Sequence, residues 1–244
     1  MMLLLTSLLV LVNCYYSSGQ ASQPPTWLFN QLKLSGDSIP LDLIAEKQHP
    51  VYSEYTIYGI PYITEYDCGK DCWSADMYVV VADASHKILR MKRMKGALTA
   101  DAIYPKKVWI DTAPYILAAN KRAFAIRVES ANNSRAARYV GEELWLMLET
   151  ISEIDCRLHL DSKTLMSYGG GGCEGEVHNQ ESIFIIDTES KTSEYYNIVE
   201  QLKYEHFFVN EDCEDRKKEV KRFKNVYRYS DGEYKVVGER KKGW

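Results

Sequence analysis

Residues typical of turns recur at short intervals along this chain. The segments between these turns are rich in β-branched and aromatic residues. The clearest run is Met77 to Ala82 (MYVVVA), and the clearest turn is Asp231-Gly232, with alternating residues on both sides. Asp-Gly in that setting is the strongest short-range signal for a β-hairpin. About ten short strands are expected, and few helical patterns compete with them. The predicted fold class is mainly β: a single-domain antiparallel β-sandwich or partly open barrel with few short helices.

Three segments are ambiguous between strand and helix. Glu142 to Glu149 has helical spacing, but it is apolar on both faces, and Glu153 to Leu160 continues with clean alternation. We therefore predict a strand there. Trp27 to Leu34 fits a short helix or an edge segment, and Glu194 to Tyr204 fits a strand or a short helix.

The composition of the chain argues against nucleic acid as a partner. The 244 residues are 45% hydrophobic and 26% charged, and the net charge is −4, so no basic footprint for nucleic acid is present. Lysine and arginine become frequent after Arg216, but acidic residues are mixed among them, which favours a solvated face. The 18 tyrosines suit half-buried pleated surfaces and favour β structure.

The first residues predict export. Met2 to Val12 is apolar but too short to span a bilayer, and Gly19-Gln20-Ala21 fits a cleavage site with small residues. We interpret residues 1–21 as a secretory signal peptide and residues 22–244 as one β-rich domain, periplasmic or secreted. Leu11 to Cys14 loosely resembles a lipobox, so a lipid anchor at Cys14 is the alternative. No later segment is apolar and long enough for a transmembrane helix.

The cysteines of an exported protein should mostly pair. Cys68 and Cys72 bracket a tight turn, and Cys173 and Cys213 both lie in polar loops, so we predict these two disulfides. Cys156 alternates with apolar residues on one predicted strand face and is expected to be a buried free thiol. A catalytic cysteine–histidine pair is the alternative use of these residues.

One stretch carries a possible metal site. Glu174, Glu176 and His178 alternate after the glycine run 169–172, which we expect to form a loop. Alternate residues of a strand share a face, and two carboxylates with an imidazole could hold a divalent metal ion. A carboxylate pair for glycoside cleavage and a plain solvent face are the alternatives. We expect the other histidines to be surface residues: His49, His86, His159 and His206.

No catalytic motif is recognisable. The chain has no Gly-x-Ser-x-Gly, no His-Glu-x-x-His and no phosphate-binding Gly-Lys-Ser/Thr. We therefore expect an exported non-catalytic binding protein (an inhibitor, immunity-type or envelope-associated protein) with a protein partner, no catalytic residues and no cofactor. The alternatives are a metal-dependent hydrolase centred on Glu174, Glu176 and His178, and a carbohydrate-binding module that uses the tyrosines between Tyr52 and Tyr66.

Overall fold

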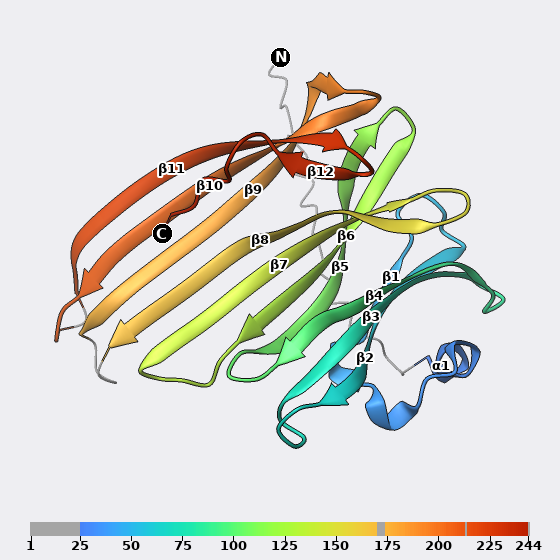
Figure 1. Ribbon diagram of the computed structural model, residues 1–244, viewed down its shortest axis with the longest axis horizontal. Coiled ribbons are helices and arrows are strands. Elements are labelled where there is room, and N and C mark those ends of the chain that lie inside the picture. The colour runs from blue at the N-terminus through green and yellow to red at the C-terminus, as the bar shows by residue number, and fades with distance from the viewer. Residues whose placement is uncertain (1–24, 170–173, 213, 244) are drawn as a thin grey trace, which may run out of the picture.

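The protein is built from two antiparallel β-sheets, one of four strands and one of eight (Figure 1). The computed structural model describes residues 25–169, 174–212 and 214–243. Strands make up 69% of it, which confirms the expected class: a mainly β sandwich or partly open barrel with few helices. None of the helices in this part of the chain is long and apolar enough to cross a membrane.

Within each sheet, every strand pairs with its neighbours in the sequence. The smaller sheet contains, in order, β1 (Ala45–Gln48), β2 (Tyr55–Tyr66), β3 (Trp73–Asp83) and β4 (Ile88–Ala100). The larger sheet contains β5 (Tyr104–Ala118), β6 (Lys121–Ala131), β7 (Ala137–Glu149), β8 (Ile154–Gly169), β9 (Gly175–Thr192), β10 (Tyr195–Val209), β11 (Asp215–Ser230) and β12 (Glu233–Val236). Before the sheets come one α-helix and two 3-10 helices, which are α1 (Thr26–Leu32), η1 (Gly36–Ser38) and η2 (Leu41–Leu43).

Several strands are longer than the sequence suggested. Strand β9 runs on through Thr188 to Thr192, and the chain reverses only at Ser193, whose φ is +58°. Residues 175–181 of β9 pair with both β8 and β10, whereas Lys191 and Thr192 pair with β10 alone. The ambiguous segment Glu142 to Glu149 is a strand, as predicted, in the second half of β7.

The run Met77 to Ala82 of β3 is apolar because both faces of the strand are covered there. Met77 packs in the cluster between the two sheets, whereas Val80 packs with Leu28 of α1 on the other side. A strand buried on both faces has no reason to alternate, which explains the unbroken run MYVVVA.

A shared core joins the two sheets. Trp145 of β7 is fully buried in it, together with Phe124 from β6 and Met77 from β3. Neighbouring residues of β7 point the other way, and Leu146 belongs to a second cluster with Leu158. The larger sheet is therefore apolar on both sides around β6 to β8.

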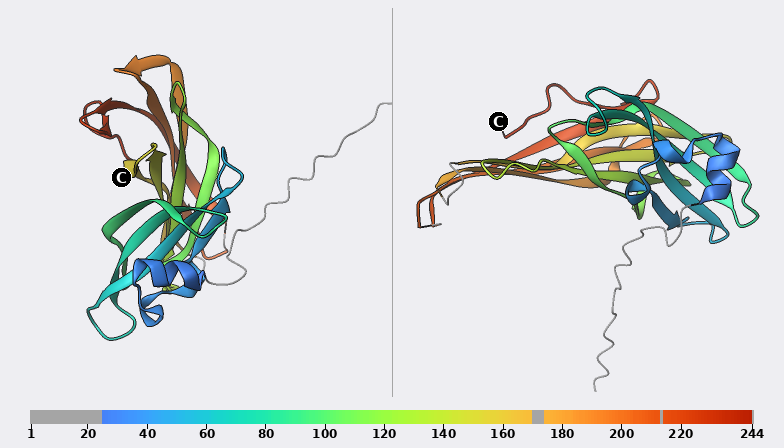
Figure 2. Two further views of the ribbon diagram at one scale, coloured as in Figure 1. Left: turned by 90° about the vertical axis from the view of Figure 1, so that its right-hand side faces the viewer. Right: turned by 90° about the horizontal axis from the view of Figure 1, so that it is seen from below.

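Beyond this core the long strands continue as a single layer. Figures 1 and 2 show β8 to β11 extending past the four-stranded sheet. We call the side of β9 to β11 that carries His178 and His206 the histidine face. The regular register places Gln180, Glu200 and Asn225 on the same face.

Candidate metal centre

Three side chains on the histidine face converge near the open end of β9 and β10. His206 pairs directly across the strands with His178, and Glu176 precedes His178 by two residues, so all three point to one side. Each residue offers a ligand atom within 4.8 Å of those of the other two. Strand pairing therefore builds a cluster of two imidazoles and one carboxylate.

One carboxylate oxygen lies close to both rings. Glu176 Oε1 is 3.2 Å from His178 Nε2 and 2.6 Å from His206 Nε2. The two rings stack with centroids 4.5 Å apart and an angle of 8° between their planes. The His206 Nε2 atom is buried but makes no hydrogen bond of acceptable geometry, although the carboxylate is so close. A nitrogen held beside an oxygen in this way is suited to sharing a cation with it.

Burial and a neighbouring tyrosine fix the orientation of His178. Its side chain is only 16% exposed, and its Nδ1 lies 2.7 Å from the hydroxyl of Tyr204 on β10. Burial, together with the charges of Glu219 and Glu176, raises the pKa of Tyr204, which keeps its hydroxyl protonated at neutral pH. With Nδ1 engaged by Tyr204, Nε2 is the nitrogen directed at Glu176. Metal-binding histidines typically have such an oxygen partner on the second nitrogen.

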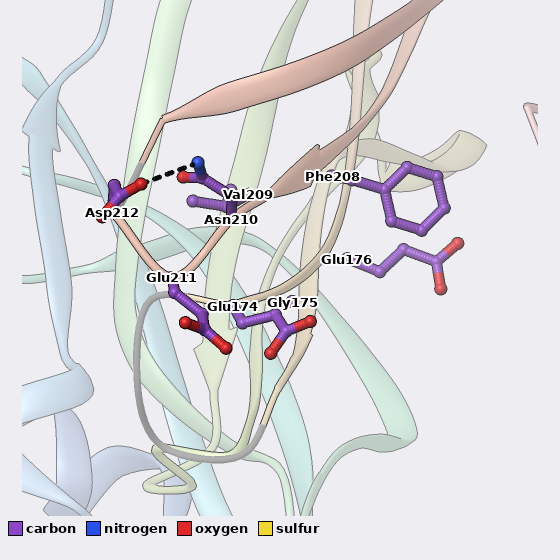
Figure 3. Close-up of a pocket in the computed structure, with 8 residues that line it drawn as sticks. All are labelled: Glu174, Gly175, Glu176, Phe208, Val209, Asn210, Glu211 and Asp212. Carbon is purple, nitrogen blue, oxygen red and sulfur yellow. Dashed lines mark hydrogen bonds between the residues drawn. The ribbon is translucent and has the colours of Figure 1, made fainter.

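An acidic pocket adjoins the cluster (Figure 3). Its volume is about 590 Å³, and Glu176 belongs to both the pocket and the cluster. Glu174, Glu211 and Asp212 add further carboxylates to its lining. A cleft lined by charges of one sign concentrates counter-ions, in this case cations.

The donor set determines which ions fit. Imidazole nitrogens suit Zn²⁺, Cu²⁺, Ni²⁺ and Fe²⁺, whereas Ca²⁺ and Mg²⁺ prefer oxygen ligands throughout. Ligand atoms about 2.0–2.1 Å from a tetrahedral Zn²⁺ lie roughly 3.3 Å from one another. The 3.2 Å separation of Glu176 Oε1 and His178 Nε2 already matches that spacing. The 2.6 Å between Glu176 Oε1 and His206 Nε2 is shorter than that spacing, so His206 has to move outward to bind the same ion.

The structure brings together two of the three residues that the sequence suggested. Glu174 precedes β9, which begins at Gly175, and it lines the pocket instead of joining the cluster. Figure 3 shows its carboxylate beside that of Glu211 and apart from that of Glu176.

The third member, His206, was expected to be a surface histidine, and that expectation is wrong. Tyr195 pairs with Thr192, so an unbroken register would place His206 opposite Glu181. The irregularity between Tyr196 and Asn197 shifts the register by three residues and brings His206 opposite His178. His49 was also expected at the surface, yet it is buried, with Nε2 2.7 Å from Glu149 Oε2.

The cysteines divide into three cases. Cys68 and Cys72 form the predicted disulfide. Cys14, Cys173 and Cys213, and with them the predicted Cys173–Cys213 disulfide, lie outside the described residues, as does the predicted signal peptide (residues 1–21). Cys156 is a free cysteine as predicted, but it is half-buried and does not share a face with Leu158. A bulge at Arg157 pairs Cys156 with Met147 and Leu158 with Leu146, so the two side chains point to opposite sides of β8.

The tyrosines considered for carbohydrate binding do not share one exposed surface. Tyr58 is 8% exposed and packs, with the half-buried Tyr62, in the cluster under α1. Tyr52 and Tyr66 are exposed, with 46% and 49% of their surface accessible, and they flank this packed part of β2.

Comparison with known proteins gives this chain no relative. No protein-family model matches it, and neither does any curated protein or solved structure.

Proposed function

We propose that this protein is an exported binding protein whose ligand is a divalent transition-metal ion held by Glu176, His178 and His206. One observation carries the proposal: two imidazole Nε2 atoms lie 3.2 and 2.6 Å from the same carboxylate oxygen. The Tyr204 hydroxyl on His178 Nδ1 and the acidic pocket beside Glu176 both support it. The sequence suggested a binding protein with an unidentified protein partner, and the present proposal gives that protein a metal-ion ligand.

Zinc titration tests this proposal. We expect the protein to bind one Zn²⁺ per chain in competition with a chromophoric chelator. Glu176→Gln and His206→Ala should each lower the affinity by about 100-fold or more, because each removes one of three ligands. Affinity should also fall in acid, since protons compete with the metal for imidazole nitrogens.

Glu174→Gln is the matched control. It removes a carboxylate from the same pocket but not from the cluster, so the affinity should change by less than about threefold. The proposal fails if wild-type protein binds no zinc, or if His206→Ala binds it as tightly as wild type. An ester-hydrolysis assay of the zinc-loaded protein then separates pure binding from the hydrolase alternative. Activity that disappears in Glu176→Gln would favour the hydrolase.

A further inference from the structure

The C-terminal segment lies across the histidine face (Figures 1 and 2). After β12 the chain bends at Gly238, whose φ of +79° suits glycine, and residues 239–243 then cross β11, β10 and β9. We call residues 237–243 the C-terminal strap. Its hydrogen bonds reach Glu200, Asn225 and Gln180 of the sheet, and Gly243 lies against the ring of Tyr204.

The strap is anchored by one arginine. Arg240 Nη2 lies 2.6 Å from Glu200 Oε1, and Arg240 Nε lies 3.1 Å from Glu200 Oε2, which is a bidentate pair. Arg240 Nη2 also donates to the backbone carbonyl of Asp161 at 3.1 Å. The Glu200 side chain is 0% exposed and that of Arg240 is 13% exposed.

Hydrogen bonds from the sheet orient the Glu200 carboxylate so that it can pair with a guanidinium group. Ser182 Oγ and Tyr227 Oη donate to the carboxylate at 2.7 and 2.8 Å, and Asn225 Nδ2 donates at 2.9 Å. Burial alone raises the pKa of Glu200, but the hydrogen bonds from Arg240, Ser182 and Tyr227 outweigh it, so the pKa is lowered. The carboxylate is therefore charged, buried and oriented, and such a group needs a cationic partner.

The rest of the strap is recognised through its backbone. The side-chain amide of Asn225 hydrogen-bonds to both backbone groups of Lys241. Asn225 Oδ1 accepts from the Lys241 N–H at 2.9 Å, and Asn225 Nδ2 donates to the Lys241 carbonyl at 3.1 Å. Gly243 donates its N–H to Gln180 Oε1 at 3.2 Å. A Cβ at Gly243 would overlap the ring of Tyr204, so the site admits only glycine there. The side chains of Lys241 and Lys242 are exposed.

We propose that the histidine face contains a peptide-recognition site for an extended segment of the pattern Arg-x-x-Gly, which the protein's own C-terminal strap occupies. Glu200 selects the arginine, Asn225 and Gln180 bind the backbone, and Tyr204 excludes side chains at the glycine. The two intervening residues point outward and are free to vary. A partner carrying this pattern competes with the strap, so the strap regulates access to the site.

A charge reversal within the full chain tests the proposal. Arg240→Glu places a second carboxylate against buried Glu200, so the strap should detach and the site should open. Lys242→Glu makes the same charge change two residues later on an exposed side chain, and the strap should stay docked. The probe is a fluorescently labelled peptide of residues 237–243, VGERKKG, followed by fluorescence anisotropy.

The expected result is binding to Arg240→Glu at least about tenfold tighter than to wild type or to Lys242→Glu. A peptide with citrulline in place of arginine, or valine in place of the glycine, should bind at least about tenfold more weakly. The proposal is overturned if a folded Arg240→Glu protein does not bind the peptide, or if the citrulline peptide binds equally well. If circular dichroism shows that Arg240→Glu does not fold, Arg240→Gln replaces it with the same expected results. The outcome is independent of zinc, because the test uses metal-free protein.

Discussion

At the scale of single residues, Cys156 shows how surroundings alter chemistry. Its Sγ lies 3.5 Å from the Leu158 carbonyl oxygen, and burial raises the pKa of the thiol from 9.0 to about 11. Thiolates, not thiols, react with alkylating agents. We expect iodoacetamide at pH 8 to modify Cys156 in the folded protein at least about tenfold more slowly than in urea-unfolded protein. Mass spectrometry of the Cys156 peptide measures both rates, and equal rates would contradict the prediction.

The raised pKa of Cys156 also makes the free energy of unfolding depend on pH. Because the thiol of Cys156 holds its proton more tightly in the folded state, its contribution to the free energy of unfolding is fully present below pH 9. That contribution is lost as the pH rises towards about 11.

Arg240 shows that composition does not reveal which charged residues have a buried partner. The sequence after Arg216 indicates a solvated face of mixed charge, and the exposed Lys241 and Lys242 agree with that interpretation. Arg240 stands between similar residues, but its partner Glu200 is 40 positions away on a buried strand. Only the folded sheet shows that one of these charges is an anchor.

At the scale of strands, pairing places Tyr204 where it can orient a ligand. Its hydroxyl lies 2.7 Å from His178 Nδ1, and its ring lies under Gly243. Tyr204→Phe removes the hydroxyl and keeps the ring, so the strap should stay docked. We expect Zn²⁺ affinity to fall by about 10-fold to 100-fold, the usual effect of losing a partner of a ligating histidine.

A chelator competition assay measures this effect. Tyr168→Phe is the matched control, because Tyr168 borders the cluster from β8 and its hydroxyl lies 3.5 Å from Met166 Sδ instead. The proposed role of Tyr204 is contradicted if the two phenylalanine variants bind zinc equally well.

The sequence predicts strands well and their registers poorly. Hydrophobic alternation, with the Asp231-Gly232 turn, was sufficient to predict the fold class. The alternation of residues along a strand was sufficient to predict that Glu176 and His178 lie on one face. The position of the third residue of the cluster, His206, depends on an irregularity between Tyr196 and Asn197. The bulge at Arg157 likewise moved Cys156 to the other side of its strand. Such irregularities arise from packing between strands and leave no distinct signal in the local sequence.

At the scale of the whole molecule, Trp145 is the largest side chain in the core that joins the two sheets. It is 0% exposed, and its Nε1 donates to Glu143 at 3.1 Å. We expect Trp145→Ala to lower the free energy of unfolding by about 3–5 kcal/mol, the usual cost of such a cavity. Urea unfolding followed by far-ultraviolet circular dichroism measures the change.

Ile151→Ala is the control for this experiment, because Ile151 is 93% exposed in the turn between β7 and β8. Its effect should stay below about 0.5 kcal/mol. Since residues from both sheets form the core around Trp145, a single cooperative transition is expected. Separate transitions for the two sheets would contradict the shared core.

The strictly sequential strand order has a consequence for how the chain comes together. Each of the two sheets is a meander in which every strand adds to the one made just before it. Closing a short loop costs little entropy, so each hairpin can form as soon as its second half emerges from the ribosome. The strap is the exception, since Arg240 reaches back to Glu200, and Gly243 to Gln180, on strands already in place. Folding from the N-terminus onward would therefore leave the Arg-x-x-Gly site open until the last residues arrive.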